Sequence, residues 1–156
     1  MASRKNGLCI LCSLRRDPFF AVNTSLIDRV CHSPGGFDAL SEAEKFYYPL
    51  TLFQDEVNNG GFHQFFFNSS GSYYDLIEGG LARLEEQQTL ELLRLAKQAV
   101  FPDIAVPADM ATRRELLPAP SSESGERLNE LDRRFYSIPD TLTAKLQAFA
   151  RERGLV

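Results

Sequence analysis

The stretch 58-NNGGFHQFFFNSSG-71 decides the fold, because two glycines separate two apolar patterns of helical spacing. Glycine readily takes the left-handed backbone that ends a helix. We therefore expect one helix to end at Gly60-Gly61 and a second to begin at once, forming a helix–Gly-Gly–helix corner. The residues expected on the buried faces before and after the glycines are Phe46, Leu50, Phe53 and Val57, then Phe62, Phe65 and Phe66.

The expected corner is lined with amides and one carboxylate. Gln64 and Asn68 are four residues apart, so their side chains are neighbours on a helix. Glu56, Asn58 and Asn59 come from the end of the preceding helix. One interpretation is architectural, because such amides can satisfy the unpaired backbone groups that helix ends leave. The other is a pocket in which they hydrogen-bond a small polar ligand or the end of a peptide.

Helix signals continue on both sides of this corner. Ser41 followed by Glu44 is a capping box, which predicts a helix start near Glu42. Pro49 lies inside that helix and predicts a kink or a restart. A box-like start at 72–75 is followed by Gly79-Gly80, where we expect the next helix to stop. Three further helices are expected over residues 85–101, 126–136 and 141–153.

These patterns indicate an all-α fold, a single compact multi-helix bundle, with no period-2 strand pattern. Residues 102–125 hold four prolines and then a Ser-rich run, so we expect a connector with one short helix over 110–117. Residues 1–18 are interpreted as a loosely ordered arm. Residues 19–156 are expected to form one domain.

The net charge of −4 arises in the middle of the chain. Residues 51–100 carry three basic and seven acidic residues, a balance of −4, whereas residues 1–50 sum to +1 and residues 101–156 to −1. Direct binding of nucleic acid is disfavoured, because it needs clustered Lys and Arg. An acidic patch and an ordinary solvated acidic face are both open interpretations. The carboxylates concerned are Asp55, Glu56, Asp75, Glu78, Glu85, Glu86 and Glu91.

The sequence favours a cytoplasmic protein without a metal site or cofactor. Its apolar stretches are shorter than the roughly 20 residues that span a bilayer, so we expect no membrane association. Cys9 and Cys12 form a CxxC pair, for which a redox couple and half of a zinc site are the alternatives. We interpret them as free thiols in the arm.

Catalytic motifs such as GxSxG, HExxH and the Walker-type phosphate loop do not occur. His63 near Ser69 or Ser70 is the remaining candidate for a hydrolase-like dyad. Asp55 and Glu56 are adjacent, so on a helix they point about 100° apart and do not form a paired acid–base site. We expect a protein that is not an enzyme, and a hydrolase using His63 is the third hypothesis.

The string 56-EVNNGGFHQFFFNSSG-71 resembles the signature of the domain family named for DNA-mimic protein nineteen. Three later segments are also similar to that family, so the resemblance covers about residues 19–153: 76-LIEGGLARL-84, 90-LELLRLAKQAVF-101 and 131-LDRRFYSIPDTLTAKLQAFARE-152. The positions that the central motif marks, none with a catalytic duty, are Glu56, Asn58, Asn59, Gly60, Gly61, Phe62, Gln64, Phe66 and Asn68.

This resemblance implies an all-α domain without a cofactor. For the namesake it implies surface carboxylates that imitate DNA phosphates and occupy a DNA-binding protein. The first hypothesis is therefore a protein-interaction domain that acts through its acidic middle third. The pocketed binding module at the corner is the second. The excess of four charges is small for mimicry, because duplex DNA carries one charge per roughly 1.7 Å.

Overall fold

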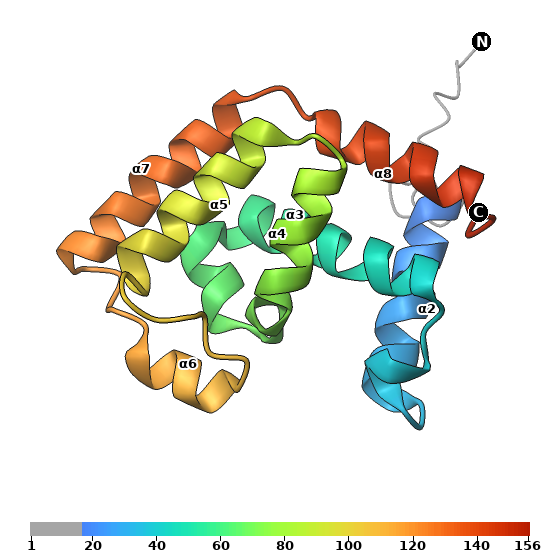
Figure 1. Cartoon of the computed structure of the whole chain (residues 1–156), viewed down its shortest axis with the longest axis horizontal. Helices are drawn as coiled ribbons and strands as arrows, with labels where there is room; N and C mark the ends of the chain where they lie inside the picture. The colour runs from blue at the N-terminus through green and yellow to red at the C-terminus, as the bar shows by residue number, and fades with distance from the viewer. Residues whose placement is uncertain (1–16) are drawn as a thin grey trace, which may run out of the picture.

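The structure is a computed structural model that describes residues 17–156, and its regular elements are all helices (Figure 1). No strand occurs in this range, which confirms the all-α prediction. Cys9, Cys12 and residues 1–16 of the expected arm lie outside the described residues. None of the described helices combines the length and apolar character needed to cross a membrane. The α-helices are α2 (Pro18–His32), α3 (Glu42–Phe67), α4 (Tyr74–Arg83), α5 (Gln87–Val100), α6 (Met110–Leu116), α7 (Glu123–Ser137) and α8 (Thr141–Glu152).

Helix α3 is the centre of the bundle. It packs against α2, α4, α6, α7 and α8, while α5 lies across α4 and α7. Figure 1 shows α2 and α8 at one end of the molecule and α5, α6 and α7 at the other, with α3 running between them. Two short 3-10 turns, Gly36–Ala39 and Ser69–Tyr73, connect α2 to α3 and α3 to α4. The second half of the bundle is therefore organised around the C-terminal half of α3.

Side-chain caps define most helix starts. The predicted capping box is present, because the Ser41 hydroxyl accepts the Glu44 N–H at 3.3 Å and the Glu44 carboxylate accepts the Ser41 N–H at 2.8 Å. Asp109, Ser122 and Asp140 cap α6, α7 and α8 in the same way, each accepting the N–H three residues further on. The short helix expected in the connector is α6, and the last residues of the connector, from Glu123, are already helical.

Three local predictions need correction. Helix α3 does not restart at Pro49 but continues through it with helical backbone angles, because Pro49 is buried with its neighbours and this packing outweighs one lost hydrogen bond. Gly79 and Gly80 lie inside α4, which ends only after Arg83. The box-like start at Ser72 caps nothing, since the Ser72 hydroxyl donates to the Ala108 carbonyl instead. Helix α2 has no counterpart among the predicted helices.

The core is rich in aromatic rings that meet across the two halves of α3. Phe53 precedes the glycine pair and Phe62 follows it, and their ring centroids lie 6.2 Å apart. Phe135 of α7 contacts both, at 6.1 and 5.9 Å, with its ring edge-on. The predicted faces of α7 and α8 are buried through Leu128, Leu131, Leu142 and Leu146. The three rings tie α7 to the bend in α3.

The two glycines of α4 offer a matched test of the packing between α3 and α4. A Cβ on Gly79 would meet no atom within 4 Å, whereas a Cβ on Gly80 would stand 2.9 Å from a methyl group of buried Leu50. We expect Gly79→Ala to raise the free energy of unfolding by about 0.5–1 kcal/mol, because alanine is the better helix former. We expect the free energy of unfolding of Gly80→Ala to be about 1–3 kcal/mol lower than that of Gly79→Ala, because the added methyl group overpacks the site. Urea unfolding measures both, and equal effects would contradict this packing.

Candidate functional site

Helix α3 is broken at Gly60-Gly61, as the sequence predicts. Gly60 has φ −155° and ψ 21°, and Gly61 has φ 74° and ψ −175°. A positive φ of this kind is rare for residues with a side chain. A Cβ on Gly61 would also stand 2.2 Å from the Asp132 carboxylate of α7. Backbone conformation and lack of space therefore both require glycine at position 61.

Helix α7 supplies the hydrogen bonds at this break. The Asp132 carboxylate accepts the Phe62 N–H at 2.8 Å, and the Tyr136 hydroxyl donates to the Val57 carbonyl at 2.7 Å. The Phe62 N–H is one of the first donors of the second half of α3, and the Val57 carbonyl is one of the last acceptors of the first half. Helix ends leave groups of both kinds unpaired. Asp132 and Tyr136 lie four residues apart, so one face of α7 serves both ends.

The Asp132 carboxyl is held in a partly buried position. Burial raises its pKa above the usual value, and the Phe62 N–H and the nearby His63 act in the opposite direction. Asp132 was not among the predicted site residues. It does lie in the segment 131-LDRRF that was matched to the family, and this match is the one signal that could have found it.

A second set of bonds crosses the same break. The Gln64 amide donates to Glu56 Oε2 at 2.7 Å, and the Asn68 amide donates to the same oxygen at 2.9 Å. Gln64 and Asn68 are neighbours, as expected, but they bond a carboxylate instead of unpaired backbone groups. Glu56 belongs to the first half of α3 and the amides to the second half, so these bonds hold the two halves together.

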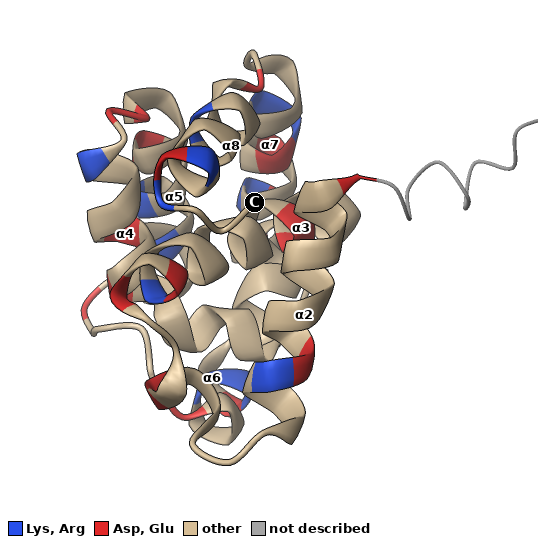
Figure 2. Ribbon diagram, turned by 90° about the vertical axis from the view of Figure 1, so that its right-hand side faces the viewer, with Lys and Arg blue, Asp and Glu red and all other residues tan. Residues whose placement is uncertain are grey.

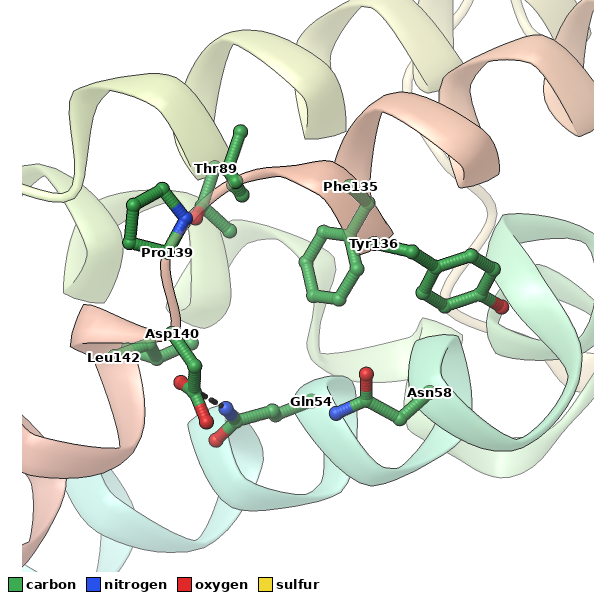
Figure 3. A pocket seen from close by; sticks show the side chains of 9 residues that line it. Gln54, Asn58, Thr89, Phe135, Tyr136, Pro139, Asp140 and Leu142 are labelled. Atoms are coloured by element: carbon green, nitrogen blue, oxygen red, sulfur yellow. Dashed lines mark hydrogen bonds between the residues drawn. The ribbon is translucent and has the colours of Figure 1, made fainter.

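Asn58 and Asn59 are exposed, and neither side chain has a hydrogen-bond partner among residues 17–156. Asn58 lines a cavity of about 150 Å³ between α3, α5 and the junction of α7 with α8. Figure 3 shows the Asn58 and Gln54 amides on one side of this cavity and the rings of Phe135 and Tyr136 on the other. Of the predicted corner residues, Asn58 is the one that lines this cavity.

The proposed acidic patch is interleaved with cations. Glu78 pairs with Arg94 at 2.8 Å, and Glu91 pairs with Arg134 at 3.6 Å. Figure 2 shows acidic and basic segments both scattered over the side of the molecule that faces the viewer. These two carboxylates are therefore partly neutralised by their neighbours.

Glu86 is different, because it is only 6% exposed. Its carboxylate lies 2.7 Å from Lys145 Nζ and accepts the Thr141 hydroxyl at 2.8 Å. It thereby joins the start of α5 to α8. Asp55, Asp75 and Glu85 are exposed, and no cation of residues 17–156 lies within ion-pair distance of them. The Asp55 side chain reaches solvent but is partly desolvated where it borders the groove between α2, α3 and α8, and this desolvation, followed by the neighbouring Glu56, raises its pKa.

His63 is half-buried beside the backbone of the connector. A ring nitrogen lies 3.3 Å from the Pro118 carbonyl, and the ring stacks on Phe67 with a centroid distance of 6.2 Å. The Ser70 hydroxyl donates to the Phe65 carbonyl instead. No described serine or threonine hydroxyl hydrogen-bonds His63, so the arrangement supplies no paired nucleophile for the hydrolase hypothesis.

Two arginines of α6 hold the C-terminal end of α3. Arg113 is fully buried and donates to the carbonyls of Phe66 and Asn68, each at 2.6 Å. Arg114 donates to the Phe67 carbonyl at 2.8 Å and lies over the Phe67 ring. Burial lowers the pKa of Arg113. The composition of the connector does not indicate that Arg113 would bind the end of α3, because the carbonyl acceptors lie more than 40 residues away in the chain.

Comparison with known proteins places this geometry in a family. The family model described as DMP19-like protein matches residues 38–153. The matched range includes the glycine break, the cavity and α7 with Asp132. Neither a search of curated proteins nor a search of solved structures returns a match.

We expect Asp132→Ala to lower the free energy of unfolding by about 1–3 kcal/mol, because it leaves the Phe62 N–H without an acceptor. Asp132→Asn keeps a carbonyl oxygen at that position and removes a partly buried charge, so its loss should be clearly smaller. Urea unfolding at neutral pH measures both variants. Equal losses would show that the hydrogen bond to Phe62 is not what Asp132 contributes.

Proposed function

Since this chain belongs to the DMP19-like protein family, we propose that it is a non-enzymatic protein-binding domain that occupies the DNA-binding surface of a partner. In this proposal its exposed carboxylates take the place of DNA phosphates. The observation that carries the proposal is the family match over residues 38–153.

The contacts of each carboxylate decide which ones can serve a partner. Glu56 and Glu86 are committed inside the molecule, the first to Gln64 and Asn68 and the second to Lys145 and Thr141. Glu86 is buried and Glu56 is partly buried, and removing such carboxylates from their partners is costly. These two residues are therefore structural and do not belong to the binding surface.

The exposed carboxylates are available at low cost. Asp55, Asp75 and Glu85 have no cation at ion-pair distance among the described residues. Glu78 and Glu91 are paired with arginines, but exposed pairs are worth only about 0–1 kcal/mol, so a partner's cation can replace the arginine. The proposed surface thus consists of Asp55, Asp75, Glu78, Glu85 and Glu91.

A partner held in this way must be basic on the surface that it presents. Attraction between exposed charges is screened by salt within about 10 Å at 0.1 M, so the complex should weaken as salt rises. Duplex DNA would compete with this domain, because both would occupy the same surface of the partner. Salt sensitivity combined with competition by DNA separates mimicry from other kinds of protein binding.

A second candidate function is binding of a small polar group beside the break. The cavity lined by Asn58 and Gln54 favours it. Because Gln64, Asn68 and Glu56 bond one another, the group would meet Asn58 and Gln54 and not the full set of corner amides.

The test is capture of proteins from a lysate of the source organism on the immobilised domain at low salt. We expect the retained proteins to elute with duplex DNA and with rising salt. The triple variant Asp55→Asn, Asp75→Asn, Glu85→Gln should bind them about tenfold more weakly, taking roughly 0.5 kcal/mol for each exposed charge.

The matched control is Glu115→Gln, Glu130→Gln, Glu152→Gln, which changes the net charge equally at other exposed positions. It should bind as the wild type does. Retention that resists both DNA and salt would overturn the mimicry proposal. Equal weakening by the two triple variants would overturn the assignment of the surface.

A further inference from the structure

We propose that the cavity beside Asn58 receives a lysine side chain of the partner protein. This inference rests on the proposed function, because the DNA-binding surface of a partner presents lysines. In this inference the cavity anchors one side chain of the partner, whereas the exposed carboxylates attract the partner's surface charges. Anchors seated in desolvated pockets carry much of the binding energy of protein interfaces.

The size of the cavity suits one side chain. Its volume is about 150 Å³. Pockets for whole small-molecule ligands usually measure about 300–1,000 Å³, so this one is too small for them. An apolar cavity of about 150 Å³ holds a benzene molecule. The unbranched butyl chain and ammonium group of lysine are comparable in bulk.

The walls suit the apolar stem of lysine. Phe135 and Tyr136 form one side, and Pro139 and Leu142 lie near the opposite end (Figure 3). Tyr136 is fixed in place, because its hydroxyl donates to the Val57 carbonyl. The rigid wall means that little side-chain freedom is lost on binding, which favours affinity. Lysine commonly packs its methylene stem on such surfaces.

The polar groups suit an ammonium. Asp140 accepts from the Gln54 amide at 2.8 Å, and this leaves the Gln54 carbonyl oxygen free as an acceptor. Asn58 adds a second free amide. An ammonium carries three donors and no acceptor, so it requires acceptors of this kind. Asp140, Gln54 and Asn58 can each supply one.

The charge of the lining favours a cation. Asp140 is the single charged residue among the residues that line the cavity. The cavity lies where α7 ends and α8 begins, so the partial negative charge of one helix end opposes the partial positive charge of the other. The Asp140 carboxylate therefore decides the sign of the local potential.

Thr89 adds a hydroxyl-bearing residue to the lining. It is 3% exposed and borders the cavity. A hydroxyl group both donates and accepts, so it suits a site that receives a polar group.

The experiment titrates n-butylammonium into the ¹⁵N-labelled protein, with n-butanol as the neutral analogue of the same shape. We expect n-butylammonium to shift the side-chain amide signals of Gln54 and Asn58 and the backbone signal of Thr89, with a dissociation constant in the millimolar range. Asp140→Asn should weaken this binding by about tenfold, because a charge-assisted hydrogen bond is lost. Asparagine remains a good helix cap, so α8 should stay intact.

Asp109→Asn is the matched control. Asp109 caps α6 by accepting the N–H and the hydroxyl of Thr112, as Asp140 does with Thr143 at the start of α8. It does not line the cavity, so we expect Asp109→Asn to bind n-butylammonium as the wild type does. Binding of n-butanol as strong as that of n-butylammonium would overturn the inference. Equal weakening by the two variants would also overturn it.

The same two variants, tested by capture of the DNA-displaceable proteins, separate this inference from the proposed function. Selective loss of capture with Asp140→Asn supports a partner lysine in the cavity. Normal capture with Asp140→Asn overturns the inference and leaves mimicry by the exposed carboxylates standing. If the protein binds n-butylammonium but captures no protein that duplex DNA displaces, the proposed function is overturned. The assignment of the cavity to a lysine of the partner is then overturned with it.

Discussion

The hydrogen bond from the Phe62 N–H to the Asp132 carboxylate is the interaction on which the rest of the structure depends. A helix broken in its middle leaves unpaired donors and acceptors, and burying each without a partner costs about 1–3 kcal/mol, a large share of the roughly 5–15 kcal/mol by which a domain is stable. Asp132 and Tyr136 satisfy one group on each side of the break. The direction of the second half of α3, and the position of Phe62 against Phe53 and Phe135, follow from that arrangement.

The same face of α7 connects the architecture of the break to the candidate binding site. Tyr136 caps the Val57 carbonyl with its hydroxyl and forms a wall of the cavity with its ring. Asn58 follows Val57 directly, so the break also decides which amides face that wall. The family motif therefore has two parts with different duties. Glu56, Gln64 and Asn68 close the break, while Asn58 remains available to a ligand.

Local signals in the sequence were sufficient for the break and for the described helices other than α2 and the end of α4. The capping box at Ser41, the apolar stripes and the glycine pair at 60–61 each act within a few residues, and the structure confirms them. Gly80 was misread as the end of a helix. Glycine is needed there because Leu50 of α3 leaves no room for a Cβ atom. Asp132 and Arg113 act on residues 70 and 47 positions away, and spacing along one sequence carries no record of such contacts. The acidic residues could be counted from the sequence, but their arginine and lysine partners could not be assigned.

Hydrogen exchange at the Phe62 amide tests the central claim most directly. The account predicts that this amide exchanges as slowly as the amide of Phe66 in the core of the same helix, because both open only with the cooperative loss of the bundle. It also predicts that Asp132→Ala accelerates exchange at Phe62 far more than at Phe66. Fast exchange of the Phe62 amide in the wild-type protein, through local opening alone, would contradict the claim that Asp132 holds the break.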